Sequence, residues 1–121
     1  MPNKIRVAIV EDADEIRDGL TFLVNASEDF ACVGSYYHAE PFLEAVADIK
    51  PQVVILDIGL PGMSGIDCIH RLKDTAPGIL IMMFTVFDDD DHLFDALMSG
   101  ANGYILKKTA PAAILDALKE L

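Results

Sequence analysis

The apolar residues of this chain follow two alternating patterns. Short continuous apolar runs predict five strands, at residues 5–10, 30–36, 53–57, 79–85 and 103–106. After each run, apolar residues recur every three or four positions, which is typical of a helix with one buried face. Strands that alternate with helices in this way predict a parallel sheet with right-handed crossovers and helices on both faces.

Prolines, glycines and small polar residues mark where the predicted helices begin and end. Pro41 and Pro111 stand near the first positions of the second and fifth helices, and Ser64 is placed to cap the third. Gly100 is placed to end the fourth helix, which carries Leu93, Phe94, Leu97 and Ala101. The aspartates at residues 88–91 lack the ligand spacing of an EF-hand loop, so we expect them to cap that helix.

The predicted fold class is α/β. We expect a flavodoxin-like (βα)5 three-layer sandwich whose five-stranded parallel sheet has the order 2-1-3-4-5. A length of 121 residues suits one domain. No apolar run approaches the roughly 18 residues of a membrane span, and the N-terminus lacks the layout of an export signal. We therefore expect a soluble, cytoplasmic protein.

Net charge and the spacing of the cysteines and histidines argue against DNA binding, metal binding through these residues and a histidine-based catalytic site. The net charge of −11 opposes binding to a polyanion, so this chain alone should not hold DNA. Cys32 and Cys68 have neither CxxC nor metal-ligand spacing, and we expect buried, reduced thiols. The three histidines show no spacing of a metal site or catalytic pair, and we expect surface or edge positions for His38, His70 and His92.

Four predicted strands end in residues that carry chemistry: Glu11 and Asp12, Asp57, Thr85, and Lys107. The carboxyl ends of parallel strands share one edge of the sheet, where ligands collect. Adjacent carboxylates repel one another unless a cation intervenes, which predicts a divalent ion with oxygen ligands, Mg²⁺ being the natural candidate. Asp57 could then attack phosphorus to give an acyl phosphate, with Thr85 and Lys107 binding the phosphoryl oxygens.

Other interpretations remain open for these residues. Asp57 could be an ordinary polar strand end, and Glu11 and Asp12 could simply cap the first helix. A phosphatase with an aspartate nucleophile would need a second acid two residues after Asp57, where Gly59 stands. A nucleotide- or flavin-binding module would need a glycine pattern that differs from the spacing of Gly59, Gly62 and Gly65.

Taken together, the motifs resemble a known family. The set runs in order along essentially the whole chain, as Glu11-Asp12, Asp57, Leu60-Pro61-Gly62-Met63-Ser64-Gly65, Thr85 and Gly100-Ala101-Asn102-Gly103-Tyr104-Ile105-Leu106-Lys107. In this it resembles the receiver domain of two-component response regulators. The run at residues 84–89 and the stretch to Lys107 are further similar to receivers that precede a helix-turn-helix output domain of the LuxR/NarL type.

The resemblance implies a phosphoacceptor site. A sensor histidine kinase would transfer a phosphoryl group from its phosphohistidine to Asp57. Magnesium would be required, and the resemblance assigns it to Glu11, Asp12, Asp57 and the backbone carbonyl of Gly59. Gly59 and Phe87 occupy positions that in the family govern the access of water to the phosphoryl group. We predict that Phe87 shields the acyl phosphate and slows its hydrolysis.

The resemblance also implies a conformational switch. Thr85 and Lys107 would bind the phosphoryl group, and Tyr104 would turn inward as Thr85 moves. Plain strand packing is the alternative for Tyr104. The family often has proline after the lysine with a cis peptide, whereas Lys108 follows here. Because a cis bond without proline costs roughly 3 kcal/mol, the isomer of this peptide stays open.

For the whole protein, the resemblance predicts a response regulatory domain over residues 1–121, with any output domain beyond the chain shown. Such a domain is a signalling module and not an enzyme, since it catalyses only its own phosphoryl transfer and slow hydrolysis. The implied partners are a sensor histidine kinase, a phosphorylation-linked homodimer, and DNA only through an output domain; no membrane is implied. A pseudo-receiver that only binds proteins is an alternative, which the intact acids, Thr85 and Lys107 oppose.

Overall fold

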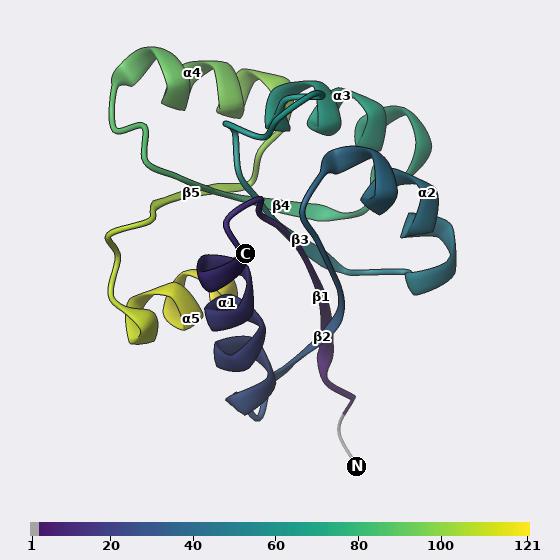
Figure 1. The fold of residues 1–121 in the computed structure, drawn as a ribbon, viewed down its shortest axis with the longest axis vertical. Coiled ribbons are helices and arrows are strands. Elements are labelled where there is room, and N and C mark those ends of the chain that lie inside the picture. The colour runs from purple at the N-terminus through teal and green to yellow at the C-terminus, as the bar shows by residue number, and fades with distance from the viewer. Residues whose placement is uncertain (1–2) are drawn as a thin grey trace.

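The computed structural model describes residues 3–121, in which five strands alternate with five helices (Figure 1). All strand pairs are parallel, and the sheet has the order β2-β1-β3-β4-β5. The predicted fold class and strand order are confirmed. The strands are β1 (Ile5–Val10), β2 (Phe30–Tyr36), β3 (Val53–Leu56), β4 (Leu80–Thr85) and β5 (Gly103–Leu106).

The helices cover both faces of the sheet (Figure 1). On one face, α1 (Asp14–Ala26) and α5 (Pro111–Lys119) pack over one hydrophobic cluster. On the other face, a second cluster lies under α2 (Ala39–Ile49), α3 (Gly65–Thr75) and α4 (Asp90–Ser99). All four residues of β3 are buried, as expected for a strand covered on both sides.

The strand register brings the carboxyl ends of the sheet level. Val10 of β1 lies opposite Leu56 of β3, and Leu56 lies opposite Met83 of β4. Thr85, the last residue of β4, lies opposite Leu106 at the end of β5. The residues that follow these strands therefore leave the sheet at one edge.

The predicted helix boundaries are present in the structure. Ser64 caps α3, because its side chain accepts a hydrogen bond from the backbone N–H of Asp67. The side chain of Asp89 caps α4 in the same way through the N–H of His92. Gly100 ends α4 with φ +117°, a left-handed conformation that glycine adopts without strain.

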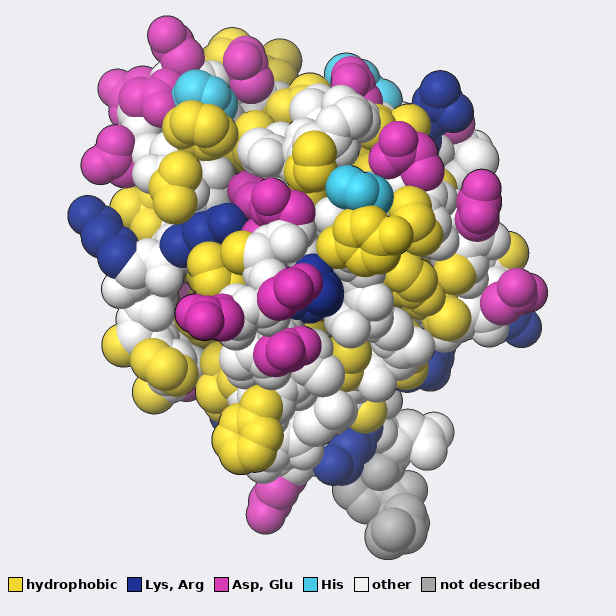
Figure 2. Space-filling model, in the orientation of Figure 1, with side chains coloured by type: hydrophobic (Ala, Val, Ile, Leu, Met, Phe, Trp, Pro, Cys, Tyr) yellow, Lys and Arg dark blue, Asp and Glu magenta, His cyan; other side chains and the backbone are white. Residues whose placement is uncertain are grey.

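Most of the apolar side chains of α4 lie at the surface. Phe94 is 63% exposed and Met98 71%, and Ala96 is the one buried residue of this helix. The apolar periodicity therefore predicted the helix but not its burial, since helical spacing does not say what lies opposite each side chain. Acidic side chains gather over α4 (Figure 2), where the aspartates of residues 88–91 span the start of the helix.

Three smaller expectations have mixed outcomes. Both cysteines are free thiols; Cys68 is buried, and burial raises its pKa to about 12, but Cys32 on the edge strand β2 is only half-buried. The prediction of burial was therefore wrong for Cys32, since an edge strand lacks a neighbour on one side. Residues 3–121 contain no cis peptide, so the bond between Lys107 and Lys108 is trans. In the same range, every helix is too short or too polar to cross a membrane.

Candidate functional site

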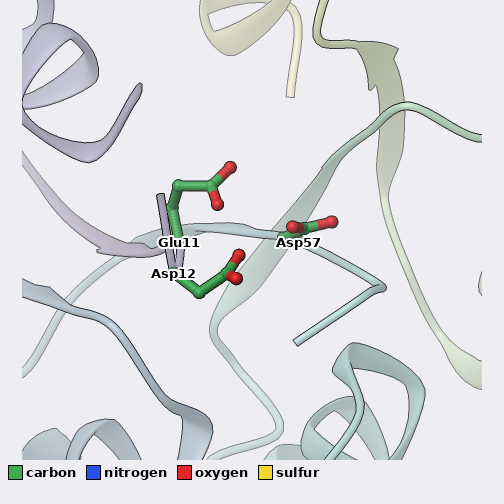
Figure 3. Close-up of side chains that lie close together, drawn as sticks. All are labelled: Glu11, Asp12 and Asp57. Atoms are coloured by element: carbon green, nitrogen blue, oxygen red, sulfur yellow. The ribbon is translucent and has the colours of Figure 1, made fainter. Parts of the chain in front are cut away.

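Three carboxylates meet at the carboxyl edge of the sheet. Glu11 and Asp12 follow β1, and Asp57 follows the neighbouring strand β3. One oxygen from each lies within 4.8 Å of the others (Figure 3). Glu11 is 1% exposed and Asp57 5%, whereas Asp12 is exposed to solvent. The structure thus brings together the three acids that the strand ends had suggested.

Backbone hydrogen bonds hold Glu11 in place. Its N–H donates to the carbonyl of Tyr36, and its carboxylate Oε2 accepts from the N–H of Ala13. Arg17 of α1 donates to the Glu11 carbonyl at 2.9 Å. Burial raises the pKa of Glu11, and the negative charge of Asp57 adds to the shift. The ionised form of Glu11 is therefore less stable in this site than it would be in water.

Lys107 connects the acids to the last strand of the sheet. Its ammonium Nζ donates a 2.9 Å hydrogen bond to Asp57 Oδ2 and lies 2.5 Å from Glu11 Oε1. Burial by itself lowers the pKa of Lys107, but the hydrogen bonds with Glu11 and Asp57 outweigh burial and raise it. The lysine therefore stays charged and partly neutralises the acids.

The donor set suits a hard divalent cation. Against three carboxylates, the described part of the chain places one ammonium in contact, so negative charge remains in excess. Magnesium prefers oxygen ligands and keeps several waters, so it needs only one or two carboxylates and an open side. Asp12 and Gly59 are exposed, which leaves one side of the cluster open to solvent. The residues present therefore fit Mg²⁺.

The loop after Asp57 has its glycines where a side chain would be costly. Gly62 has φ +74°, and a Cβ atom on Gly65 would lie 2.2 Å from the carbonyl oxygen of Asp57. The N–H of Gly65 also donates to the carbonyl of Ile58 at 2.9 Å. Gly65 thus lets α3 start directly against the backbone of the phosphoacceptor candidate, and this contact helps to hold Asp57 at the edge.

Thr85 and Tyr104 both bind the backbone of Phe87. Thr85 is completely buried at the end of β4, and its Oγ1 accepts a 3.3 Å hydrogen bond from the N–H of Phe87. Tyr104 Oη donates a 2.7 Å hydrogen bond to the carbonyl of Phe87. Burial and the negative charges of Asp89 and Asp88 raise the pKa of Tyr104, so its phenol remains a donor. The loop between β4 and α4 is therefore tied to both residues.

The ring of Phe87 borders the same space as Asp57. A Cβ atom built on Gly59 would lie 3.6 Å from Phe87 Cε2 and 4.0 Å from Asp57 Oδ1. The ring and the carboxylate therefore both border the open position at Gly59. The ring also stacks on the imidazole of His92, with centroids 3.9 Å apart and an interplanar angle of 4°.

Comparison with known proteins shows the family of the chain. A family model described as the response regulator receiver domain matches residues 7–119. The chain belongs to this family. Its relatives are of the LuxR/NarL type, and receivers of this family are signalling domains.

Two curated relatives and one solved structure illustrate the similarity. The chain is 31% identical to the transcriptional regulatory protein YxjL of Bacillus subtilis, over 97% of this chain and 54% of that protein. It is 28% identical to the nitrate/nitrite response regulator NarL of Escherichia coli, over 94% of this chain and 53% of that protein. It therefore spans about half the length of these relatives. A signal receiver domain from Mycobacterium tuberculosis, assigned to a response regulator named NarL, superimposes with a TM-score of 0.93 at 25% identity. The match covers 98% of this chain and 96% of that chain.

In this receiver domain, one contact residue was not anticipated from the sequence. His92 was expected at a surface or edge position, and its side chain is indeed 39% exposed, but it also stacks on Phe87. Asp89 and His92 stand three residues apart at the start of a predicted helix, and this spacing indicated their mutual contact but not the stack on Phe87. That spacing places a cap residue next to a ring that can bind it.

Proposed function

We propose that Asp57 accepts a phosphoryl group from the phosphohistidine of a sensor histidine kinase. An Asp57 carboxylate oxygen attacks phosphorus, and a P–O bond forms while the P–N bond to the kinase imidazole breaks. The imidazole nitrogen keeps the electron pair, and the product is an acyl phosphate. The position of Asp57 supports this proposal: its residue is 5% exposed, yet its Oδ1 lies 4.0 Å from the open position that a Cβ atom on Gly59 would occupy.

The residues around Asp57 have separate roles in this proposal. Glu11, Asp12, Asp57 and the backbone carbonyl of Gly59 would hold Mg²⁺, which when bound supplies positive charge to the phosphoryl group in transfer. Lys107 would move its hydrogen bond from Asp57 Oδ2 to a phosphoryl oxygen, and the hydroxyl of Thr85 would donate to another. The ammonium is already in the site, so only a short shift is needed.

One observation carries the proposal. The ammonium of Lys107 contacts both Glu11 and Asp57 inside a cluster whose three carboxylates lie within 4.8 Å of one another. Such a cluster is costly unless a cation balances the charge of the carboxylates. A phosphatase that used the same nucleophile would need a second acid at position 59, where the chain has an exposed glycine.

The proposal extends to a switch and an output. Phosphorylation would draw Thr85 toward the phosphoryl group and let Tyr104 turn inward, changing the surface around α4 and β5. The domain would act in signalling, catalysing only its own phosphoryl transfer and slow hydrolysis. Control of a DNA-binding output domain is supported by the names of YxjL and NarL as regulators and by their roughly twofold greater length.

A phosphorylation assay tests the proposal directly. The chain would be incubated with Mg²⁺ and acetyl phosphate, and its intact mass measured. We expect a gain of one phosphoryl group that is absent in Asp57→Asn and unchanged in Asp88→Asn, since Asp88 is an exposed acid outside the cluster. No gain in the parent chain, or an equal gain in Asp57→Asn, would contradict it.

Assembly has its own test. We propose a phosphorylation-linked homodimer, which predicts that the solution mass of the chain doubles when Mg²⁺ and a phosphoryl mimic are added. Asp57→Asn under the same conditions provides the control. A mass that stays monomeric with the mimic bound would contradict the dimer and leave the phosphoacceptor role of Asp57 to the mass-gain experiment.

A further inference from the structure

The stack between Phe87 and His92 joins the loop at the site to the first turn of α4. The two rings are nearly parallel, at an interplanar angle of 4° and a centroid distance of 3.9 Å. In the unphosphorylated chain, the N–H of Phe87 donates to Thr85 Oγ1 and its carbonyl accepts from Tyr104 Oη. The ring of Phe87 is only partly buried against the hydrophobic core, so its direction depends also on the ring that it stacks against.

Asp89 fixes the imidazole of His92. The Asp89 carboxylate caps α4 by accepting from the N–H of His92 at 3.1 Å, and His92 Nδ1 lies 2.7 Å from the same carboxylate. The hydrogen bonds from His92 lower the pKa of Asp89, so the carboxylate is ionised and can only accept. The Nδ1 atom therefore carries the hydrogen, and one carboxylate orients both the helix start and the ring.

These contacts end beside the phosphoacceptor. Phe87 Cε2 and Asp57 Oδ1 both lie within 4.0 Å of the point that a Cβ atom on Gly59 would occupy. Gly59 has no side chain to fill the position next to Asp57 Oδ1. The nearest side-chain atom to that position is Cε2 of Phe87. A ring held here reduces the room for a water molecule to approach a phosphoryl group on Asp57.

We propose that Asp89 and His92 are positioning residues that hold the Phe87 ring beside Asp57 and thereby lengthen the lifetime of the acyl phosphate. The inference rests on the proposed phosphoacceptor role of Asp57. In the step that it slows, a water oxygen attacks phosphorus and the P–O bond to Asp57 breaks. The carboxylate is regenerated, the water oxygen leaves with one proton as part of hydrogen phosphate, and the other proton passes to solvent.

The experiment measures the decay of the acyl phosphate. The chain is phosphorylated with acetyl phosphate and Mg²⁺, the donor is removed by rapid desalting, and loss of the phosphoryl group is followed by intact mass. We expect His92→Ala to lose it about twofold to tenfold faster than the parent, the range that the loss of one aromatic pair allows. His92→Phe keeps a flat ring that can stack on Phe87 but cannot bind Asp89, so it should restore part of the lifetime. His70→Ala, at an exposed histidine of α3, should leave it unchanged.

A double variant separates positioning from general destabilisation. If His92 acts through Phe87, then His92→Ala should not accelerate decay further in a Phe87→Ala background. In the unphosphorylated chain, the stack should also shift the ring proton resonances of Phe87 through the imidazole ring current, and His92→Ala should remove that shift.

The outcomes distinguish this inference from the proposed function. A parent chain that gains no phosphoryl group overturns both. A phosphorylated parent whose His92→Ala variant decays at the parental rate overturns the inference alone. The same follows if His92→Phe decays as fast as His92→Ala, or if the effects of His92→Ala and Phe87→Ala multiply.

Discussion

Tyr104 Oη donates a 2.7 Å hydrogen bond to the carbonyl of Phe87, seventeen residues earlier in the chain. The N–H of Phe87 in turn donates to Thr85 Oγ1. Phe87 therefore links the hydroxyl proposed to bind the phosphoryl group with the phenol proposed to rotate. If Thr85 turns its hydroxyl toward a phosphoryl oxygen, the loop loses one of these two restraints, and the hydrogen bond of Tyr104 is the other.

Removing the phenol of Tyr104 tests this link. We expect Tyr104→Phe to lower the free energy of unfolding by about 1 kcal/mol in the unphosphorylated chain, the usual net value of one hydrogen bond. With Mg²⁺ and a phosphoryl mimic the difference should shrink, because the proposed rotation of Tyr104 breaks this bond. Urea denaturation with and without the mimic measures both values. An equal difference in the two states would count against the rotation.

Magnesium should stabilise the folded chain through the three acids. A ligand that binds only the folded state adds about 2.7 kcal/mol to the free energy of unfolding at a hundred times its Kd. We expect this gain to disappear in Asp12→Ala and after chelation. It should persist in Asp18→Ala, which removes an exposed acid of α1 outside the cluster. Denaturation across a Mg²⁺ titration gives the result, and an undiminished gain in Asp12→Ala would exclude the assigned ligand set.

Lys107 should make a pH-dependent contribution to stability. Its partners raise its pKa in the folded state above the ordinary 10.5, so the contribution is fully present below that value. It is lost as the pH rises through the raised pKa. We expect Lys107→Met to be less stable than the parent by about 2 kcal/mol at neutral pH, with the gap closing in alkaline solution.

The control for Lys107 is its neighbour in the chain. Lys108 is exposed and has no carboxylate partner among the ion pairs of residues 3–121. Lys108→Met should therefore match the parent over the whole pH range. Urea denaturation between neutral pH and about pH 11 compares the three proteins. A gap for Lys107→Met that does not change with pH would show that its ion pairs are not the cause.

Phe87 should slow the loss of the phosphoryl group. We expect the phosphate of Phe87→Ala to decay about threefold to tenfold faster than that of the parent, because the ring no longer limits the approach of water. Phe87→Tyr keeps the ring and should decay at nearly the parental rate. Phe22→Ala removes a phenylalanine that is 77% exposed on α1 and controls for the general effect of truncation. Decay of Phe87→Ala no faster than the parent would refute the shielding role.

The elements of this fold could be predicted because their signals are local. The apolar run at residues 53–57 predicted a strand, and the structure has β3 at Val53–Leu56 with Asp57 directly after it. Prolines, caps and Gly100 marked helix ends through backbone geometry that involves only nearby residues. The strand order follows from general rules for parallel α/β sheets, so alternation of the elements was enough to predict it.

The surroundings of the site residues could not be predicted in this way. The sequence indicated that Glu11, Asp57 and Lys107 end different strands, but the contacts of the ammonium depend on side-chain directions that only packing settles. The same holds for the stack of His92 on Phe87 and for the close approach of Gly65 to the carbonyl of Asp57.

The amino-acid order alone was thus sufficient for the strands, the helices, the parallel sheet and the residues that share its carboxyl edge, since periodicity and backbone preferences act over a few residues. Folding in three dimensions determined which of those residues touch, that α4 leaves Phe94 and Met98 in solvent, and that the partly exposed His92 stacks on Phe87. Contacts and burial depend on what lies opposite a side chain, and that neighbour comes from elsewhere in the chain.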